Sequence, residues 1–343
     1  MTDTSHTLQA RPASSVIYVG ISFGLAVFFT LSLFAGYQSL GFWDAMGGLF
    51  ACPFNAQKSV EAVIMQEIRL PRTLLAILIG ASLGLSGAAL QGLFRNPLAE
   101  PGIMGVSASA GLGGVIAIYF GWGSLFFLAT PLAAIVTASI TMFILLMISL
   151  RDTTPLTLIL AGVALSSLAV SFTSLAMNLS PNPFALSEMI FWLLGSVRDR
   201  SLADLAIALP FMALGWCLLF MSQKSLDALS LGEDVARSLG VDLRWIRQLV
   251  IMGTTLCVGA SVAVAGAIGF VGLVVPHMLR PLVGHMPSNL LLPSALGGAL
   301  LLLAADVVVR VLPGNQELML GVLTSFIGVP FFLYLILKRL PGL

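Results

Sequence analysis

The sequence predicts an all-α, polytopic membrane protein of about ten transmembrane helices, with an internal inverted repeat and short re-entrant or interfacial helices. Of its 343 residues, 58% are hydrophobic and 9% are charged, and the mean hydropathy is +1.03. This composition leaves too little polar surface to cover a soluble globule. Apolar segments recur along the whole chain, so residues 1–343 are predicted to form a single transmembrane domain.

The repeat is visible in residues 80–105 and 259–284, where small residues and a proline coincide without a gap. In both copies, a helix rich in small residues is predicted to end at a proline break. Repeats with helices broken at matching positions are typical of membrane transporters. We place the two repeats at about 70–180 and 248–340. The coinciding pairs include Gly80 with Gly259, Ser82 with Ser261, Gly87 with Gly266, Pro97 with Pro276 and Gly105 with Gly284.

Nine apolar runs are close to the roughly 20 residues that cross a bilayer as a helix. They lie at about 16–36, 72–94, 102–120, 124–149, 155–178, 203–222, 248–272, 289–310 and 317–338. A tenth span is predicted at 269–284, which is short and interrupted but suits a broken helix buried inside protein. Residues 187–195 are apolar over about half a span and predict a re-entrant or interfacial helix. Residues 1–15 lack the features of a cleavable signal and predict a short tail.

Orientation follows from the basic residues, which favour the cytoplasm when they lie in short loops. Basic residues next to the first and last spans and in the long connection at 223–248 predict that both termini are cytoplasmic. Several arginines are then left on the outer face, against the usual bias: Arg69, Arg72, Arg310 and the Arg198-Asp199-Arg200 cluster. This placement predicts an external acidic partner.

Each of these arginines also has a purely structural interpretation. Arg69 has Glu67 as a possible ion-pair partner, and it is also able to extend to lipid headgroups. Asp306 and Arg310 have the i,i+4 spacing of an ion pair on one helix.

The segment 223–247 is the most polar part of the chain and predicts two short cytoplasmic helices. Leucines form two apolar clusters, and Gly232 and Gly240 mark helix ends. Exposed leucines require a protein to cover them. The alternative is that the helices lie on the membrane surface, but such helices are usually rich in Lys and Arg, whereas this segment carries both signs of charge.

Several kinds of motif are missing from the sequence. There is no GxxxxGK[ST] loop, so the chain is not expected to hydrolyse ATP, and HExxH and GxSxG are absent too. Neither the three histidines nor the three cysteines show metal-ligand spacing. We therefore predict no catalytic residue, no metal and no cofactor. With 16 basic against 15 acidic residues, nothing suggests nucleic-acid binding.

Five segments resemble, in order, the permeases of type II ABC importers, the FecCD family, which take up iron-siderophores, haem and vitamin B12. They are residues 68–110 (with RNPLAEP), 228–241 (with LGEDVARSLG), 266–284, 291–310 (ending ADVVVR) and 317–339. The resemblance covers nearly the whole chain beyond the first span. It implies ten helices per subunit in the bacterial inner membrane and a second permease subunit, here expected to give a homodimer. It also implies two cytoplasmic ABC ATPase subunits and a periplasmic substrate-binding protein as partners, with membrane lipid around them.

The resemblance also implies roles for particular residues. Arg69, Arg72 and Arg310 match the outer arginines that meet acidic residues of the binding protein. In the inner loop, a helix with the pattern E-x-x-A-x-x-x-G fits a cleft of the ATPase, although Asp234 stands where the commonest pattern has alanine. The coupling residues implied are Leu231, Gly232, Glu233, Ala236, Leu239 and Gly240.

Asn96, Pro97 and Leu98 match an inner turn at the cytoplasmic end of the pathway, as a gate or as a structural capping turn. Gln91 is predicted to face the pathway. Gly80, Gly84 and Gly87 are instead predicted to serve helix packing.

The function predicted is that of a transport subunit, not an enzyme, which uses ATP-driven movements of the inner loop to open a central channel alternately to each side. The substrate is left open among ferric siderophores, haem and corrinoids. The alternative is a secondary, ion-coupled transporter with inverted repeats, although no mid-membrane carboxylate relay is evident. A channel or structural membrane protein comes third.

Overall fold

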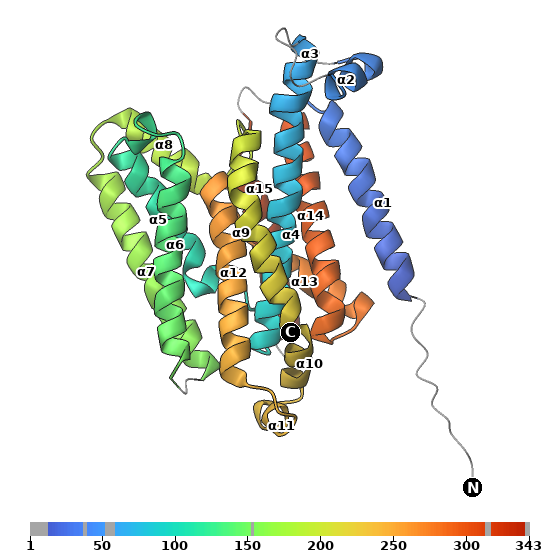
Figure 1. The fold of residues 1–343 in the computed structure, drawn as a ribbon, viewed down its shortest axis with the longest axis vertical. Helices are drawn as coiled ribbons and strands as arrows, with labels where there is room; N and C mark the ends of the chain where they lie inside the picture. The colour runs from blue at the N-terminus through green and yellow to red at the C-terminus, as the bar shows by residue number, and fades with distance from the viewer. Residues whose placement is uncertain (1–12, 37–39, 52–58, 152–153, 313–316, 340–343) are drawn as a thin grey trace.

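The computed structural model describes residues 13–36, 40–51, 59–151, 154–312 and 317–339, and the described chain is helical (Figure 1). Cys52, residues 1–12 and the last four residues lie outside this description. The helices are α1 (Ala13–Phe34), α2 (Phe42–Leu49), α3 (Val60–Val63), a π-helix (Ile64–Arg69), α4 (Leu70–Leu93), a 3-10 turn (Pro101–Met104), α5 (Val106–Tyr119), a second 3-10 turn (Trp122–Ser124), α6 (Ala129–Ser149), α7 (Pro155–Asn178), α8 (Pro183–Leu194), α9 (Leu202–Met221), α10 (Gln223–Ser230), α11 (Glu233–Ser238), α12 (Leu243–Ala265), α13 (Val271–Val283), α14 (Pro287–Val311) and α15 (Leu320–Arg339).

The helices match the predicted spans one for one. Among the described residues, seven helical segments are long and apolar enough to cross a membrane: α1, α3 to α4, α6, α7, α9, α12 and α14. The remaining spans correspond to the shorter apolar helices α5, α13 and α15. The hidden tenth span predicted at 269–284 is α13, and the predicted half-span at 187–195 is the short helix α8.

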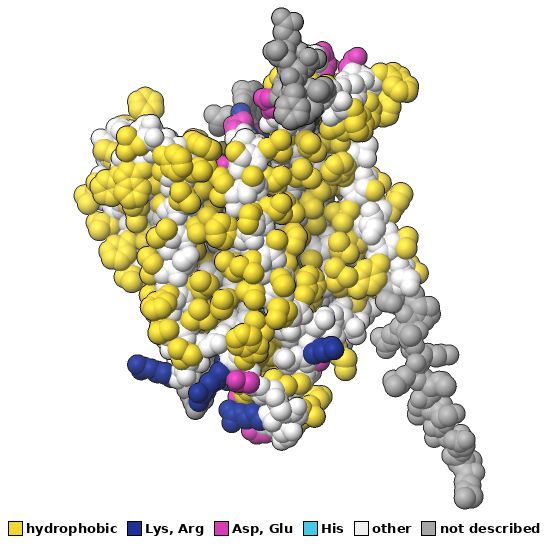
Figure 2. Space-filling view, viewed as in Figure 1, with side chains coloured by type: hydrophobic (Ala, Val, Ile, Leu, Met, Phe, Trp, Pro, Cys, Tyr) yellow, Lys and Arg dark blue, Asp and Glu magenta, His cyan; other side chains and the backbone are white. Residues whose placement is uncertain are grey.

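Hydrophobic side chains cover the whole middle of the face shown in Figure 2, and charged side chains gather at its upper and lower ends. Such a band is what a bilayer requires of the surface that it surrounds. The helices α4 and α12 are mostly buried inside the chain, whereas α1, α7 and α9 are mostly exposed. The centre of the fold is therefore built on one long helix from each repeat.

The two repeats run in opposite directions. In Figure 1, α4 descends and is followed by the short helix α5, which runs toward the upper end. Helix α12 ascends and is followed by the short helix α13, which runs toward the lower end. The inverted repeat is thus confirmed in its topology.

The predicted residue-by-residue match of the two breaks is wrong. Helix α4 continues to Leu93, and Pro97 lies in the turn after it, as predicted. Helix α12 already ends at Ala265, and Pro276 lies inside α13. The second break is made by the backbone, because Gly266 (φ +69°) ends α12 and Phe270 (φ +66°) precedes α13, both in left-handed conformations that a right-handed helix does not continue through.

Helices α4 and α14 pack together through their backbones. A Cβ atom on Gly80 would collide with the Gly298 carbonyl, and one on Gly84 would collide with the Ser294 carbonyl. Gly87 is in the same position against the backbone of α13. Small residues at such contacts let membrane helices approach closely, which confirms the predicted packing role of these glycines.

Helices α2 and α3 and the π-helix at the upper end were not expected from the sequence. They form a small cap beside α1, in which Ala45, Met65 and Leu33 are buried together. The Gln66 amide holds the end of α2 by donating to the carbonyls of Gly48 (3.0 Å) and Ala51 (2.8 Å). This cap leads directly into Arg69 and α4.

Candidate functional site

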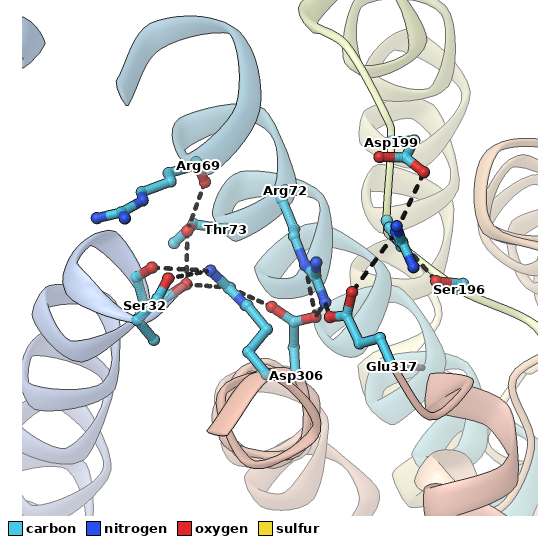
Figure 3. A network of polar contacts seen from close by, with 11 residues as sticks. Ser32, Arg69, Arg72, Thr73, Ser196, Asp199, Asp306 and Glu317 are labelled. Atoms are coloured by element: carbon cyan, nitrogen blue, oxygen red, sulfur yellow. Dashed lines mark hydrogen bonds and ion pairs between the residues drawn. The ribbon is translucent and has the colours of Figure 1, made fainter. Parts of the chain in front are cut away.

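The three arginines predicted on the outer face belong to one network of polar contacts, in which Figure 3 labels Arg69 and Arg72. Arg69 ends the π-helix, Arg72 lies in the first turn of α4, and Arg310 lies in the last turn of α14. The contact between α4 and α14 brings them into one cluster. Their side chains are largely buried, so the structure places them inside a network rather than on an open surface.

Asp306 of α14 is the centre of this network. Its side chain is fully buried, and Arg72 donates to its Oδ1 from Nε (2.9 Å) and Nη2 (2.8 Å). Arg310 donates to Oδ2, which confirms the i,i+4 ion pair considered for these two residues. Two arginines share one carboxylate, which explains how three like charges are held together in a buried position.

The network extends to α1 on one side. Arg310 donates from Nη1 to the Ser32 carbonyl (2.9 Å) and from Nη2 to the Ser32 hydroxyl (2.5 Å). Arg69 donates to the Leu33 carbonyl (2.7 Å). The Ser32 and Thr73 hydroxyls lie 2.6 Å apart. These bonds satisfy carbonyl groups at the C-terminal end of α1, which have no partner within the helix.

On the other side the network reaches the surface. Arg72 also donates to Glu317, which precedes α15. The second oxygen of Glu317 lies 3.6 Å from Nε of Arg198, and Asp199 lies 3.2 Å from the same nitrogen. The Arg198 side chain is 49% exposed, so it is the accessible end of the network. The role of Glu317 was missed, because it is a single acidic residue without a motif around it.

A cavity of about 1010 Å³ opens beside Arg198 at the upper end. Its walls come from the ends of α5, α6 and α8 and from the segment before α9, and they include Phe127, Trp192, Asp199, Arg200 and Glu317. The Arg200 guanidinium lies 5.5 Å from the centre of the Trp192 ring, a cation–π contact. The predicted 198–200 cluster therefore lines a mixed aromatic and charged hollow.

At the lower end, the segment 223–247 contains the two predicted short helices, α10 and α11. Leu226 and Leu229 belong to α10 and are buried where this helix packs on α4 and α14. Other apolar side chains of the loop face solvent, with Leu231 64% and Leu239 63% exposed. Ala236 is buried, and Gly232 (φ +119°) and Gly240 (φ +81°) flank α11 with left-handed backbone.

One ion pair and one hydrogen bond hold this loop against the helices above it. The Glu233 carboxylate lies 3.3 Å from Nη2 of the buried Arg247 on α12. Asp227 Oδ1 accepts from the Ser288 N–H in the first turn of α14 (2.8 Å). Glu233 therefore orients α11 from within the chain, whereas Leu231, Leu239 and Gly240 are presented outward.

The turn after α4 holds Asn96, Pro97 and Leu98 at the lower end. Asn96 Oδ1 accepts from the Leu98 N–H (3.0 Å), so the capping turn considered for this segment is present. The placement of Gln91 toward a pathway is wrong. Its side chain is buried between α4 and α13, where its Oε1 accepts from Nη2 of Arg280 (2.6 Å).

Within the described part of the chain, no cluster of histidine, cysteine, aspartate and glutamate side chains has the arrangement of a metal site. The charged groups at both ends instead form ion pairs, some of them at the protein surface. The arrangement is suited to contacts with other proteins.

Comparison with known proteins gives a consistent result. Residues 24–338 match the FecCD transport family. The vitamin B12 import system permease proteins BtuC of Salmonella paratyphi A and Salmonella typhimurium are each 43% identical to this chain over 314 residues, covering 90% of this chain and 90% of the relative. A solved structure described as a metal-chelate type ABC transporter in an inward-facing conformation superimposes with a TM-score of 0.81 at 33% identity. That match covers 95% of this chain and 100% of the other.

Proposed function

The chain belongs to the FecCD transport family, and on this basis we propose that it is the permease subunit of an ATP-driven importer that moves a corrinoid or an iron chelate into the cytoplasm. The observation that carries the proposal is the extent of the match, which spans both repeats and the inner loop in one alignment. The vitamin B12 permeases make a corrinoid the first substrate to test, and the metal-chelate transporter makes an iron chelate the second.

The lower end is proposed to be cytoplasmic and to bind the ABC ATPase. The exposed leucines beside Gly232 and Gly240 form an apolar surface in an otherwise polar loop. Such a surface is typical of a binding site for another protein. The chain itself has no nucleotide-binding loop, so ATP hydrolysis is assigned to that separate subunit.

The upper end is proposed to face the periplasm and to dock a substrate-binding protein through acidic residues. Arg69, Arg72 and Arg310 supply buried positive charge, and Arg198 brings the same network to the surface. Charges at the rim of an interface mainly set the rate and orientation of encounter.

A second copy of the chain is proposed to pack against the exposed apolar faces of α7 and α15. Phe172 on α7 and Phe326 on α15, the latter 79% exposed, are typical of these faces. The substrate pathway would then lie between two identical subunits, and movement of the inner turn around Asn96 would open it to the cytoplasm.

Reconstitution in proteoliposomes tests the function. The permease, its ATPase and its binding protein are expected to take up labelled cyanocobalamin or a ferric siderophore only when ATP is present on the ATPase side. Uptake driven by a proton or sodium gradient without ATP would favour the ion-coupled transporter instead. Absence of uptake of both ligand classes with active ATPase would contradict the proposed substrates.

The docking proposal predicts a slower encounter when Arg198 is replaced by glutamate. Because steering by surface charge changes association rates by about tenfold or more, Arg198→Glu should lower the association rate of the binding protein by about that factor at low salt and should flatten its salt dependence. The rate is measured with purified binding protein and the transporter in nanodiscs at two ionic strengths. Arg151→Glu, an exposed arginine at the lower end, is the matched control and should leave the rate unchanged. Equal rates in both variants would assign Arg198 to internal ion pairing alone.

A further inference from the structure

A carboxylate from the first repeat binds the backbone of the second. Glu100 lies two residues after Leu98, in the segment that joins the inner turn to α5. Its Oε1 accepts a hydrogen bond from the backbone N–H of Phe270, at 2.7 Å. Phe270 is the residue before α13, so Glu100 joins the turn after α4 to the break between α12 and α13.

The Phe270 backbone depends on this bond. Phe270 has φ +66°, a left-handed conformation that is unusual for a bulky side chain. As the N-cap residue immediately before α13, it has a backbone N–H with no acceptor within the helix. A carboxyl oxygen beside a helix N-terminus is a suitable acceptor for such an N–H, whether the group is charged or neutral. Glu100 therefore stabilises the conformation that begins α13.

The same conformation places the Phe270 ring against α15. A Cβ atom on Gly328 would overlap with Cβ and ring atoms of Phe270, so the ring lies directly on the α15 backbone. A second contact follows further along both helices, where the His277 and Phe331 rings meet edge to face at 5.9 Å. The start of α13 is thus one of the contacts that position α15, beside those that α14 and α8 make with it.

There is room for this contact to change. A cavity of about 100 Å³ adjoins the Glu100 carboxylate and is lined by Leu83, Ser107, Gly269 and Gly272 among others. A void of this size beside a hydrogen-bonded carboxylate lets the side chain shift without repacking the helices around it.

We propose that Glu100 is a positioning residue for transport, which transmits movement of the inner turn at 96–98 through the Phe270 backbone to α15. This inference rests on the proposed importer function, because it assigns α15 to the pathway and the inner turn to its cytoplasmic end. Nothing in the proposed roles of the inner loop or the arginine network requires it.

The test compares Glu100→Met with Glu100→Gln in the complete transporter. Methionine keeps the volume without the acceptor, whereas glutamine keeps an acceptor oxygen at the same reach. Glu100→Met leaves the Phe270 N–H unsatisfied, which corresponds to about a tenfold effect, so the variant should lower substrate uptake per ATP hydrolysed by about tenfold. Glu100→Gln should stay within about twofold of the wild type on the same scale. Glu61→Met, on α3 at the opposite end, is the control and should not change the ratio.

Two further measurements separate positioning from general stability. Hydrogen exchange of the peptide spanning residues 266–275 should increase in Glu100→Met and stay at the wild-type level in Glu100→Gln. Phe270→Asn keeps the N–H and tolerates the left-handed conformation but removes the ring, so it should keep the exchange protection and still lose coupling.

The proposal is overturned if Glu100→Met shows the faster exchange but transports with wild-type coupling, or if Phe270→Asn couples normally. Should Glu100→Met fail to fold, Phe270→Asn and Glu100→Gln decide the question alone. A failure of the importer function itself is distinguishable, because the wild-type protein would then show no ATP-dependent uptake, whereas the exchange experiment would still report the bond.

Discussion

Tryptophan in place of Gly240 is expected to abolish ATP-driven transport and to prevent stable association with the ATPase, while the permease still folds. Gly240 is at the end of the α11 segment, with φ +81°, and no described atom lies within 4 Å of the position that its Cβ would take. A side chain here meets open space in the isolated permease, and the backbone strain of about 1–2 kcal/mol is local. Between two proteins, however, the indole would occupy the space that the ATPase surface must fill.

Co-purification of the tagged ATPase with the permease measures this effect, together with uptake in proteoliposomes. The chain offers a closely matched control in Gly121, which also has a left-handed backbone (φ +66°) and open space around its Cβ position but follows α5 at the upper end. Gly121→Trp should have the same backbone strain and should still retain the ATPase. Normal co-purification of Gly240→Trp would show that the ATPase binds elsewhere.

Asp306→Asn is expected to destabilise the permease by about 3–5 kcal/mol, because it removes one partner from a buried network of ion pairs. The asparagine keeps the shape and one acceptor oxygen but not the charge that Arg72 and Arg310 share. Both guanidinium groups would remain in a buried position, where Arg72 keeps its ion pair with the Glu317 carboxylate. We expect a lower thermal unfolding midpoint and a lower yield of folded protein in detergent.

Asp199→Asn is the control for this prediction. Asp199 also pairs with an arginine, Arg198, but its side chain is 82% exposed, and pairs of this kind contribute about 0–1 kcal/mol. Its unfolding midpoint should be close to that of the wild type. Adding Arg310→Gln to Asp306→Asn should recover part of the loss, since it removes one of the two buried charges. Equal unfolding midpoints for Asp306→Asn and Asp199→Asn would show that the burial of Asp306 does not increase its contribution to the stability of the permease.

The membrane-spanning helices were predictable from the sequence because the thickness of a bilayer fixes the length of an apolar helix. Even α13 was predictable, since the prolines and glycines that interrupt residues 269–284 are tolerated in a short buried helix. The two helices of the inner loop followed from two apolar clusters, one before and one after Gly232, with Gly232 and Gly240 marking helix ends.

The contacts within the candidate site were only partly predictable. The Arg69, Arg72 and Arg310 group followed from charge placement and from the family resemblance, but the bond from Arg72 to Asp306 joins residues 234 positions apart. The bond from Glu100 to Phe270 spans 170 positions. Neither contact leaves a local sequence pattern, because each forms only when one repeat packs against the other. The repeat register was wrong for a similar reason, since left-handed backbone at Gly266 ended α12 where we expected a proline to do so.

The glycine contact between α4 and α14 has a mechanical consequence. Helices slide past each other when a layer of side chains lies between them and can change rotamers, and Gly80, Gly84, Ser294 and Gly298 leave no such layer. We therefore expect α4 and α14 to travel as one rigid body during the transport cycle. Asp227 fastens the lower end of that body to α10, and Asp306 carries the arginines at its upper end. A push on the lower end of this body would then tilt its upper end directly, and the hinge must lie among the other helices.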